Sequence, residues 1–145
     1  MKKNLQSILL AEDNNDHYLN FIQAVNSISN KIDVMRVDNG YSLLSMLETY
    51  IKPDAIFLDI DMPYKGGLQI LEELKERINF KDTPVVILSA SAFDLIIKVS
   101  YQLGAILFIK KYSRPSDLQK CLEAAFSNPY FQTCKQPPWE EYIIE

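Results

Sequence analysis

The sequence has few of the residues that build disulfide scaffolds and zinc sites. It contains two cysteines, Cys121 and Cys134, and a single histidine, His17. Two thiols do not make a disulfide framework, and reduced cysteines are ordinary in a cytoplasmic protein, which is where we expect this chain to lie. A zinc site needs several histidine or cysteine ligands. His17, which we interpret as a surface residue, therefore does not indicate one.

Long apolar runs and clusters of basic residues are also missing. No stretch is long enough to cross a membrane. The formal net charge is −4 and the lysines and arginines are scattered, which argues against direct binding to nucleic acid. The 145 residues suffice for one domain with a sizeable core. The sequence predicts that domain over residues 1–127, followed by a tail over 128–145 that lies on the surface or is partly disordered.

What the chain does have is a regular alternation of two patterns. Short apolar runs closed by turn residues predict strands, and apolar residues three or four positions apart predict helices. We expect strands at 7–11, 32–37, 53–59, 85–88 and 105–109, each followed by a helix. The first helix is capped by Asn14 or Asn15, and the fourth ends at Gly104. This order predicts an α/β fold, a doubly wound (βα)5 arrangement of the flavodoxin-like type with five parallel strands in the order 2-1-3-4-5.

Polar side chains follow four of these strands directly. They are Glu12-Asp13, Asp59, Ser89 and Lys110-Lys111. Because the carboxyl ends of parallel strands meet at one edge of the sheet, we expect these side chains to lie together. Three carboxylates repel one another unless a cation lies among them, and carboxylates with water suit Mg²⁺. A lysine and a hydroxyl beside them suit phosphoryl oxygens, so the set favours phosphoryl transfer to a carboxylate.

At these positions the chain resembles the receiver domains of two-component response regulators. The resemblance covers roughly residues 5–127 and depends on four motifs in combination. They are Ala-Glu-Asp-Asn at 11–14, Phe-Leu-Asp-Ile-Asp-Met-Pro at 57–63, Ile-Leu-Ser-Ala at 87–90, and Gly104-Ala105 followed by Lys111. The position of Gly104 identifies Lys111, rather than Lys110, with the family's active-site lysine.

The resemblance implies a role for each matching residue. Asp59 accepts a phosphoryl group from a phosphohistidine on a sensor histidine kinase or a histidine phosphotransfer protein. Asp13, Asp59 and the backbone carbonyl of Asp61 hold Mg²⁺, and Glu12 acts mainly through a bound water. Lys111 pairs with Asp59 and then with the phosphoryl oxygens. The two switch residues are Ser89, which moves to bind the phosphoryl group, and Phe108, whose inward turn accompanies that movement.

The chain departs from the family pattern at two positions. Tyr112 follows Lys111 where the family usually has a proline, often with a cis bond, so the isomer of that bond is left open. Asp61 places an additional carboxylate beside the phosphoryl position. We hypothesise that Asp61 and Ser91 together set the lifetime of the phosphorylated state.

A partner surface is expected over the fourth helix and the fifth strand. Ile97 and Tyr101 lie four positions apart, away from the stripe that we expect to face the sheet, and Phe108 lies nearby. Phosphorylation would alter this surface for a downstream protein or for a second copy of the chain in a homodimer. The tail is too short for an effector domain, which predicts a stand-alone receiver or a piece of a longer chain.

Two alternatives remain open from the residues alone. Haloacid-dehalogenase-like phosphatases also phosphorylate the first aspartate of an Asp-x-Asp pair, and Asp59-Ile60-Asp61 fits that pattern. Their other metal carboxylates come after the pair, however, whereas Glu12-Asp13 precedes it here. The second alternative is a receiver fold that binds partners without being phosphorylated. The expected activity is that of a signalling phospho-acceptor that assists its own phosphorylation and dephosphorylation, rather than that of an enzyme.

Overall fold

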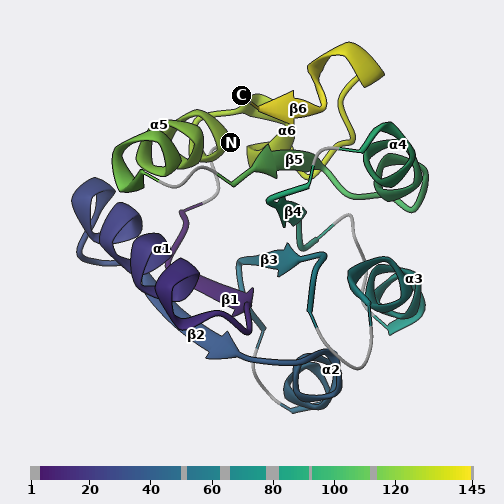
Figure 1. Ribbon diagram of the computed structural model, residues 1–145, viewed down its shortest axis with the longest axis horizontal. Helices are drawn as coiled ribbons and strands as arrows, with labels where there is room; N and C mark the ends of the chain where they lie inside the picture. The colour runs from purple at the N-terminus through teal and green to yellow at the C-terminus, as the bar shows by residue number, and fades with distance from the viewer. Residues whose placement is uncertain are drawn as a thin grey trace.

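Short apolar runs form the strands of one parallel sheet, and helices cover both of its faces (Figure 1). The computed structural model describes residues 4–49, 52–62, 66–77, 82–91, 93–111 and 114–144. The strands are β1 (Ser7–Ala11), β2 (Asp33–Val37), β3 (Ala55–Asp59), β4 (Val85–Ser89), β5 (Leu107–Lys110) and β6 (Ile143–Ile144). The helices are α1 (Asn15–Ile28), α2 (Gly40–Leu47), α3 (Gly67–Arg77), α4 (Asp94–Gln102), α5 (Pro115–Phe126), α6 (Pro129–Thr133) and the 3-10 turn η1 (Trp139–Glu141).

The strands lie in the order β2-β1-β3-β4-β5-β6, and every neighbouring pair is parallel. This confirms the expected doubly wound fold and its order 2-1-3-4-5. β1 and β3 are neighbours, and Ala11 is paired with Leu58. The residues that follow β1 therefore lie beside Asp59 at the end of β3, as the topology requires.

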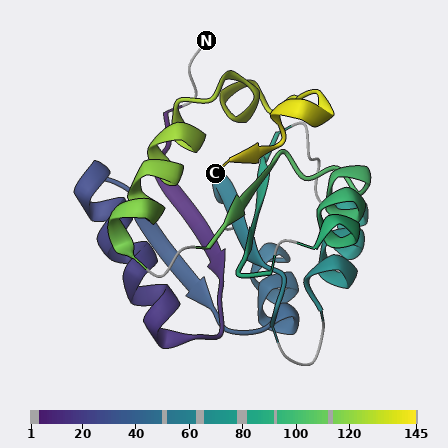
Figure 2. The ribbon, with the colours of Figure 1, turned by 45° about the horizontal axis from the view of Figure 1, so that its top comes forward.

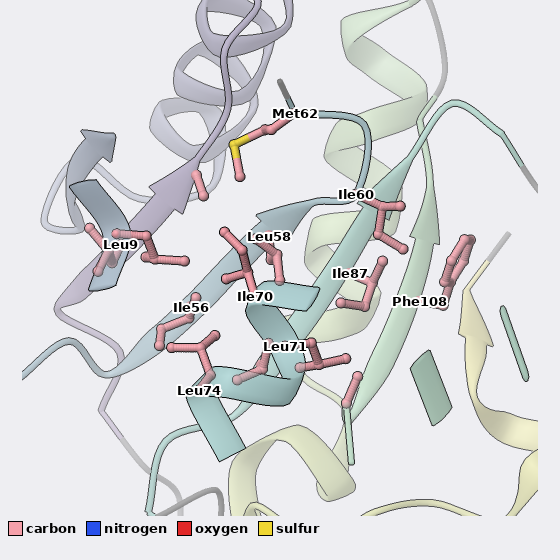
Figure 3. Packing of buried hydrophobic residues seen from close by; sticks show 14 of the residues in the cluster. Leu9, Ile56, Leu58, Ile60, Met62, Ile70, Leu71, Leu74, Ile87 and Phe108 are labelled. Carbon is pink, nitrogen blue, oxygen red and sulfur yellow. The ribbon is translucent and has the colours of Figure 1, made fainter. Parts of the chain in front are cut away.

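The central strands are apolar on both faces because helices bury both. Ile8 and Leu10 of β1 point to the face that α1 and α5 cover, while Leu9 points to the face that α2, α3 and α4 cover. This alternation follows from the two-residue period of a strand. Figure 3 shows the second face, where the side chains of Leu58 and Ile87 meet those of α3.

An asparagine side chain caps the start of α1, and a glycine follows the end of α4, as the sequence predicts. Asn14, one of the two expected caps, accepts a hydrogen bond from the backbone N–H of His17 (3.0 Å). Gly104 has a φ of 101°, the left-handed conformation that glycine adopts most readily after the end of a helix. α4 ends at Gln102, so Gly104 lies just beyond the helix, where the sequence predicts the terminating glycine.

The C-terminal residues add a sixth strand that the sequence pattern did not indicate. β6 pairs with β5, with Phe108 opposite Ile143 and Ile109 opposite Ile144. In Figure 2 this segment, drawn in yellow, lies over the end of the sheet between α4 and α5. A two-residue strand is too short to show a period of two, which is why the five-strand prediction omitted it.

Candidate functional site

Asp59 ends β3 at the carboxyl edge of the sheet and is 2% exposed. One carboxylate oxygen, Oδ1, accepts the backbone N–H of Asp61 at 2.9 Å. The other, Oδ2, lies 3.2 Å from the ammonium nitrogen of Lys111. The pKa of Asp59 is raised to about 6, chiefly because the carboxyl is buried; its hydrogen bond with Glu12 also raises the pKa, whereas the positive charge of Lys111 lowers it. A buried carboxylate with this environment is typical of a reactive group rather than a surface acid.

Glu12 and Asp13 lie in the loop between β1 and α1. Glu12 is buried, and its backbone is held on both sides: its N–H donates to Val37 O (2.9 Å), and its carbonyl accepts from Nε of Arg36 (2.9 Å). Asp13 is exposed. Carboxylate oxygens of Glu12, Asp13 and Asp59 all lie within 4.8 Å of one another. Oxygen ligands at this spacing have the chemistry of a site for a hard divalent cation.

Lys111 follows β5 and brings a positive charge into this acidic cluster. Its side chain is 11% exposed, and its ammonium contacts Glu12 in addition to Asp59. Its backbone N–H donates to Ser89 O at 2.8 Å, which ties the end of β5 to the end of β4. The lysine thereby neutralises part of the negative charge that burial makes costly.

His17 is a residue of this site that the sequence interpretation missed. Its Nδ1 lies 3.1 Å from Nζ of Lys111 and 3.7 Å from Oε1 of Glu12. Because an ammonium only donates hydrogen bonds, Nδ1 is the acceptor toward Lys111. The histidine is 42% exposed, so the expectation of a surface position holds for part of its ring only. The sequence did contain one signal that His17 could lie near the site. His17 is the third residue after the cap Asn14, on the first turn of the helix that begins beside Glu12 and Asp13.

Ser89 is fully buried, and its hydroxyl is engaged by the loop that follows β4. It donates to Ser91 O (2.7 Å) and accepts the N–H of Ser91 (3.1 Å). Asp61 Oδ2 lies 3.5 Å from the same hydroxyl. The two residues expected to tune the site, Asp61 and Ser91, therefore both contact the switch serine. The structure brings together Glu12, Asp13, Asp59, Asp61, Ser89, Ser91 and Lys111, all of which the sequence predicts.

The prediction of an exposed partner surface at Ile97, Tyr101 and Phe108 is wrong for this structure. Ile97 is 5% exposed and Phe108 is fully buried. Tyr101 is half-buried, and its hydroxyl donates to Pro137 O at 2.7 Å. Ile97 lies on the inward face of α4 and belongs to the core. Tyr101 and Phe108 are instead contacted by the C-terminal residues, which the sequence pattern could not indicate. Pro63 and the Lys111–Tyr112 bond lie outside the described residues, so the isomer of that bond stays open.

A comparison with protein-family models decides the family. Residues 8–123 match the model described as the response regulator receiver domain. This chain belongs to the response regulator receiver family. The match supports the receiver interpretation over the haloacid-dehalogenase-like alternative. Receiver domains are phospho-acceptor signalling proteins rather than classical enzymes, and a divalent metal binds at their acidic site.

Relatives of this receiver domain include both short and long proteins. Response regulator Rcp1 of Synechocystis sp. is 27% identical over 124 residues, covering 80% of this chain and 83% of Rcp1. The positive alginate biosynthesis regulatory protein of Pseudomonas aeruginosa is 32% identical over 87 residues, or 60% of this chain, and the match spans only 33% of that protein. The crystal structure of the phosphorylated cyanobacterial phytochrome response regulator RcpA is 28% identical, with a TM-score of 0.77, covering 86% of this chain and 96% of that one.

The Mn²⁺-bound crystal structure of Rcp1 has the same fold, with a TM-score of 0.76 at 24% identity over 92% of this chain and 99% of that one. Within the part of this receiver domain that the structure describes, no helix is long and apolar enough to span a bilayer.

Proposed function

We propose that this receiver domain accepts a phosphoryl group on Asp59 from a phosphohistidine of a sensor histidine kinase or a histidine phosphotransfer protein. The observation that supports this most strongly is the environment of Asp59, a buried carboxylate between Lys111 and the acids Glu12 and Asp13. Phosphorylation would then change the surface around α4 and β5 for a downstream protein partner. A cytoplasmic location, without contact to membrane or nucleic acid, is part of the same proposal.

The donor atoms at this edge of the sheet fit Mg²⁺. Three carboxylates within 4.8 Å supply oxygen ligands and an excess of negative charge. We infer that Asp13, Asp59 and the backbone carbonyl of Asp61 would hold the ion, with Glu12 acting through a bound water. Such an ion supplies charge neutralisation to the incoming phosphoryl oxygens.

The residues of the chain would carry out the transfer as follows. A carboxylate oxygen of Asp59 attacks phosphorus, the bond between phosphorus and the donor's imidazole nitrogen breaks, and its electron pair stays on that nitrogen. Lys111, 3.2 Å from Asp59, offsets charge on the phosphoryl oxygens. Ser89 would exchange its hydrogen bond to Ser91 O for one to a phosphoryl oxygen. In this way the domain assists its own phosphorylation. In dephosphorylation a water oxygen would attack the same phosphorus, the bond between phosphorus and the Asp59 oxygen would break with its electron pair staying on the carboxylate, and inorganic phosphate would leave.

We infer that Asp61 and Ser91 set the lifetime of the phosphorylated state, because both contact Ser89. The carboxylate of Asp61 and the backbone of Ser91 compete with the phosphoryl group for the serine hydroxyl. Asp61→Asn removes the competing charge and should change the first-order rate of dephosphorylation by more than twofold. Ser91→Ala keeps the backbone contact with Ser89 and measures what the Ser91 hydroxyl adds to that rate. Equal rates in wild type and both variants would contradict the hypothesis.

The test of the proposed function is intact-protein mass after incubation with acetyl phosphate and Mg²⁺. We expect one added phosphoryl group in wild type and none in Asp59→Asn. Asp33→Asn is the matched control, because Asp33 is an exposed aspartate at the opposite, amino-terminal end of its strand. Labelling of Asp59→Asn to the wild-type extent, or continuous release of phosphate without a stable label, would contradict the proposal. A protein that takes no label and binds no beryllofluoride would be a binding module.

A further inference from the structure

Residues 136–144, which we call the C-terminal strap, cross the face formed by α4 and β5 (Figure 2). The strap ends as strand β6, which extends the sheet beyond β5. The N–H of Phe108 donates to Tyr142 O at 3.0 Å. The strap therefore uses the backbone groups of β5 that an edge strand would otherwise expose.

Tyr142 is the anchor of the strap and is completely buried. Its hydroxyl lies 2.7 Å from the buried hydroxyl of Ser100 on α4. Its ring lies 5.0 Å from the ring of Tyr101 and 6.3 Å from that of Phe108, between centroids. Burial raises the pKa of the Tyr142 phenol above its usual value, which keeps it a neutral hydrogen-bonding group. An aromatic ring with a satisfied hydroxyl is an efficient anchor for a bound segment.

Polar contacts fix the rest of the strap on the same face. The hydroxyl of Tyr101 donates to Pro137 O, and the side-chain amide of Gln136 donates to Ala105 O at 3.0 Å. Trp139 lies 5.2 Å from Tyr101 and stays 43% exposed. A strand added to a sheet edge, an aromatic side chain in a pocket and side-chain hydrogen bonds are the elements by which proteins bind extended peptides.

The strap is connected to the phosphorylation site through two strands. β6 pairs with β5 at Phe108, and β5 pairs with β4, where Phe108 lies opposite Ile87 and Lys110 opposite Ser89. Figure 3 shows Phe108 beside the yellow C-terminal strand. A displacement of Ser89 at the end of β4 would therefore act on the strand to which the strap is bound.

We propose that the C-terminal strap is an intramolecular pseudo-ligand of the α4–β5 face. The partner that this face fits is a protein segment that adds to β5 as a parallel strand and inserts an aromatic ring in place of Tyr142. With the strap bound, Tyr142 fills the buried position between Ser100, Tyr101 and Phe108 that such a ring would take, so strap release creates the docking surface. Phosphorylation of Asp59 favours that release, a step that rests on the function proposed above.

Trp139 provides a direct measurement of strap release, because it is the only tryptophan of the chain. The full-length protein is mixed with Mg²⁺ and beryllofluoride, which mimics the phosphoryl group. We expect the Trp139 emission to shift to longer wavelength and its quenching by acrylamide to rise at least about twofold. The Asp59→Asn variant should not respond.

Fluorine NMR of the same samples separates the two proposals. Bound beryllofluoride with unchanged Trp139 emission and quenching overturns the strap proposal and leaves the proposed function intact. The absence of bound beryllofluoride overturns the proposed function, and with it the coupling of the strap to Asp59. Bound beryllofluoride together with the Trp139 change supports both.

A peptide with the sequence of residues 136–144 tests the docking surface. Labelled with a fluorophore, it should bind the beryllofluoride form of the full-length protein at least about tenfold more tightly than the free form. The same peptide with alanine in place of its tyrosine should lose that gain. Equal binding of the two peptides, or equal binding to the two forms, overturns the proposal.

Tyr142→Phe is a mild variant that keeps the ring and removes only the hydroxyl contact with Ser100. We expect it to raise acrylamide quenching of Trp139 in the absence of beryllofluoride, because the bound strap loses one buried hydrogen bond. Tyr41→Phe is the matched control, since Tyr41 is 60% exposed on α2, away from the strap. Identical quenching in wild type and Tyr142→Phe, in a protein that still folds, overturns the anchor role.

Discussion

At the scale of single residues, the ammonium of Lys111 is held by three partners. It hydrogen-bonds Glu12 and His17, the latter at 3.1 Å, and it forms an ion pair with Asp59 at 3.2 Å. A phosphoryl oxygen that approaches Lys111 must therefore share it with groups that are already bound. His17 contacts the lysine from the first turn of α1.

We predict that His17→Ala slows labelling of Asp59 by acetyl phosphate. The loss of one hydrogen bond, worth about 1 kcal/mol, corresponds to about a fivefold lower rate if the restraint on Lys111 acts in the transition state. Time courses of intact-protein mass measure this rate. Leu19→Ala, an exposed position on the same helix, should keep the wild-type rate. An unchanged rate in His17→Ala would show that the contact does not position Lys111.

The raised pKa of Asp59 makes the site a source of instability in the metal-free protein. The pKa rises from 3.8 to about 6 on folding, mainly because of burial. A raised pKa means that the folded state is relatively stable below pH 4, where the carboxyl is protonated in both states. That stability is lost as pH rises through about 6, where the folded protein must carry a buried charge.

We predict that Asp59→Asn stabilises the metal-free protein at pH 7. The shift corresponds to a gain on the order of 1–3 kcal/mol in the free energy of unfolding, since asparagine carries no charge. Urea unfolding of both proteins at pH 7 and pH 4.5 measures the difference, which should shrink at the lower pH. Added Mg²⁺ should also shrink it, by neutralising the carboxylates of wild type. A difference that does not vary with pH would contradict the assignment to Asp59.

At the scale of elements, the start of α3 is pressed against the end of β3. The N–H of Gly67 donates to Ile60 O at 3.1 Å. A Cβ atom at Gly67 would lie 2.4 Å from Cα of Ile60 and 3.0 Å from the carbonyl oxygen of Asp59. Glycine is therefore required at this position by close approach of two backbones, and the contact holds the residues that follow Asp59.

We predict that Gly67→Ala destabilises the protein by about 2 kcal/mol or more, because helix and strand must move apart. The displaced backbone of Asp59 should also lower the rate of phosphoryl labelling. Gly66→Ala is the matched control, since a Cβ there meets no atom within 4 Å. Thermal unfolding and mass labelling of both variants test this, and equal behaviour of the two would contradict the close-approach explanation.

At the scale of the whole molecule, both halves of the core recruit a side chain from beyond residue 127. Phe131 of α6 joins the cluster on the α1 and α5 face, with its ring 6.4 Å from that of Phe57. Tyr142 joins the cluster on the other face. Residues 128–144 therefore pack against the rest of the protein. The domain boundary after residue 127 stays a prediction from the sequence.

We predict that truncation after Ser127 lowers the free energy of unfolding by about 3 kcal/mol or more, because it removes two buried aromatic rings. Truncation after Cys134 keeps Phe131 and should cost less. Urea unfolding of the full chain and both truncated chains measures each step. A chain ending at Ser127 that is as stable as the full chain would show that residues 128–144 contribute nothing to the core.

The order of the first five strands and most of the site could be predicted from the sequence. Apolar runs that alternate with amphipathic helices predict a doubly wound sheet, and the order 2-1-3-4-5 brings the ends of β1, β3, β4 and β5 to one edge. Asp59 and Ser89 are the last residues of β3 and β4, while Glu12-Asp13 and Lys111 come directly after β1 and β5. Their meeting could therefore be predicted from the sequence.

Which surfaces remain open depended on long-range packing. Tyr101 looks exposed by helical spacing, but local spacing carries no information on a segment that returns from more than thirty residues away to bind Tyr101 and Ser100. The same holds for His17. Its position on the first turn of α1 is local, but its contact with Lys111 depends on the packing of α1 beside α5, the helix that comes after Lys111 in the chain. Long-range packing of side chains, rather than periodicity, made the strap part of the α4–β5 face.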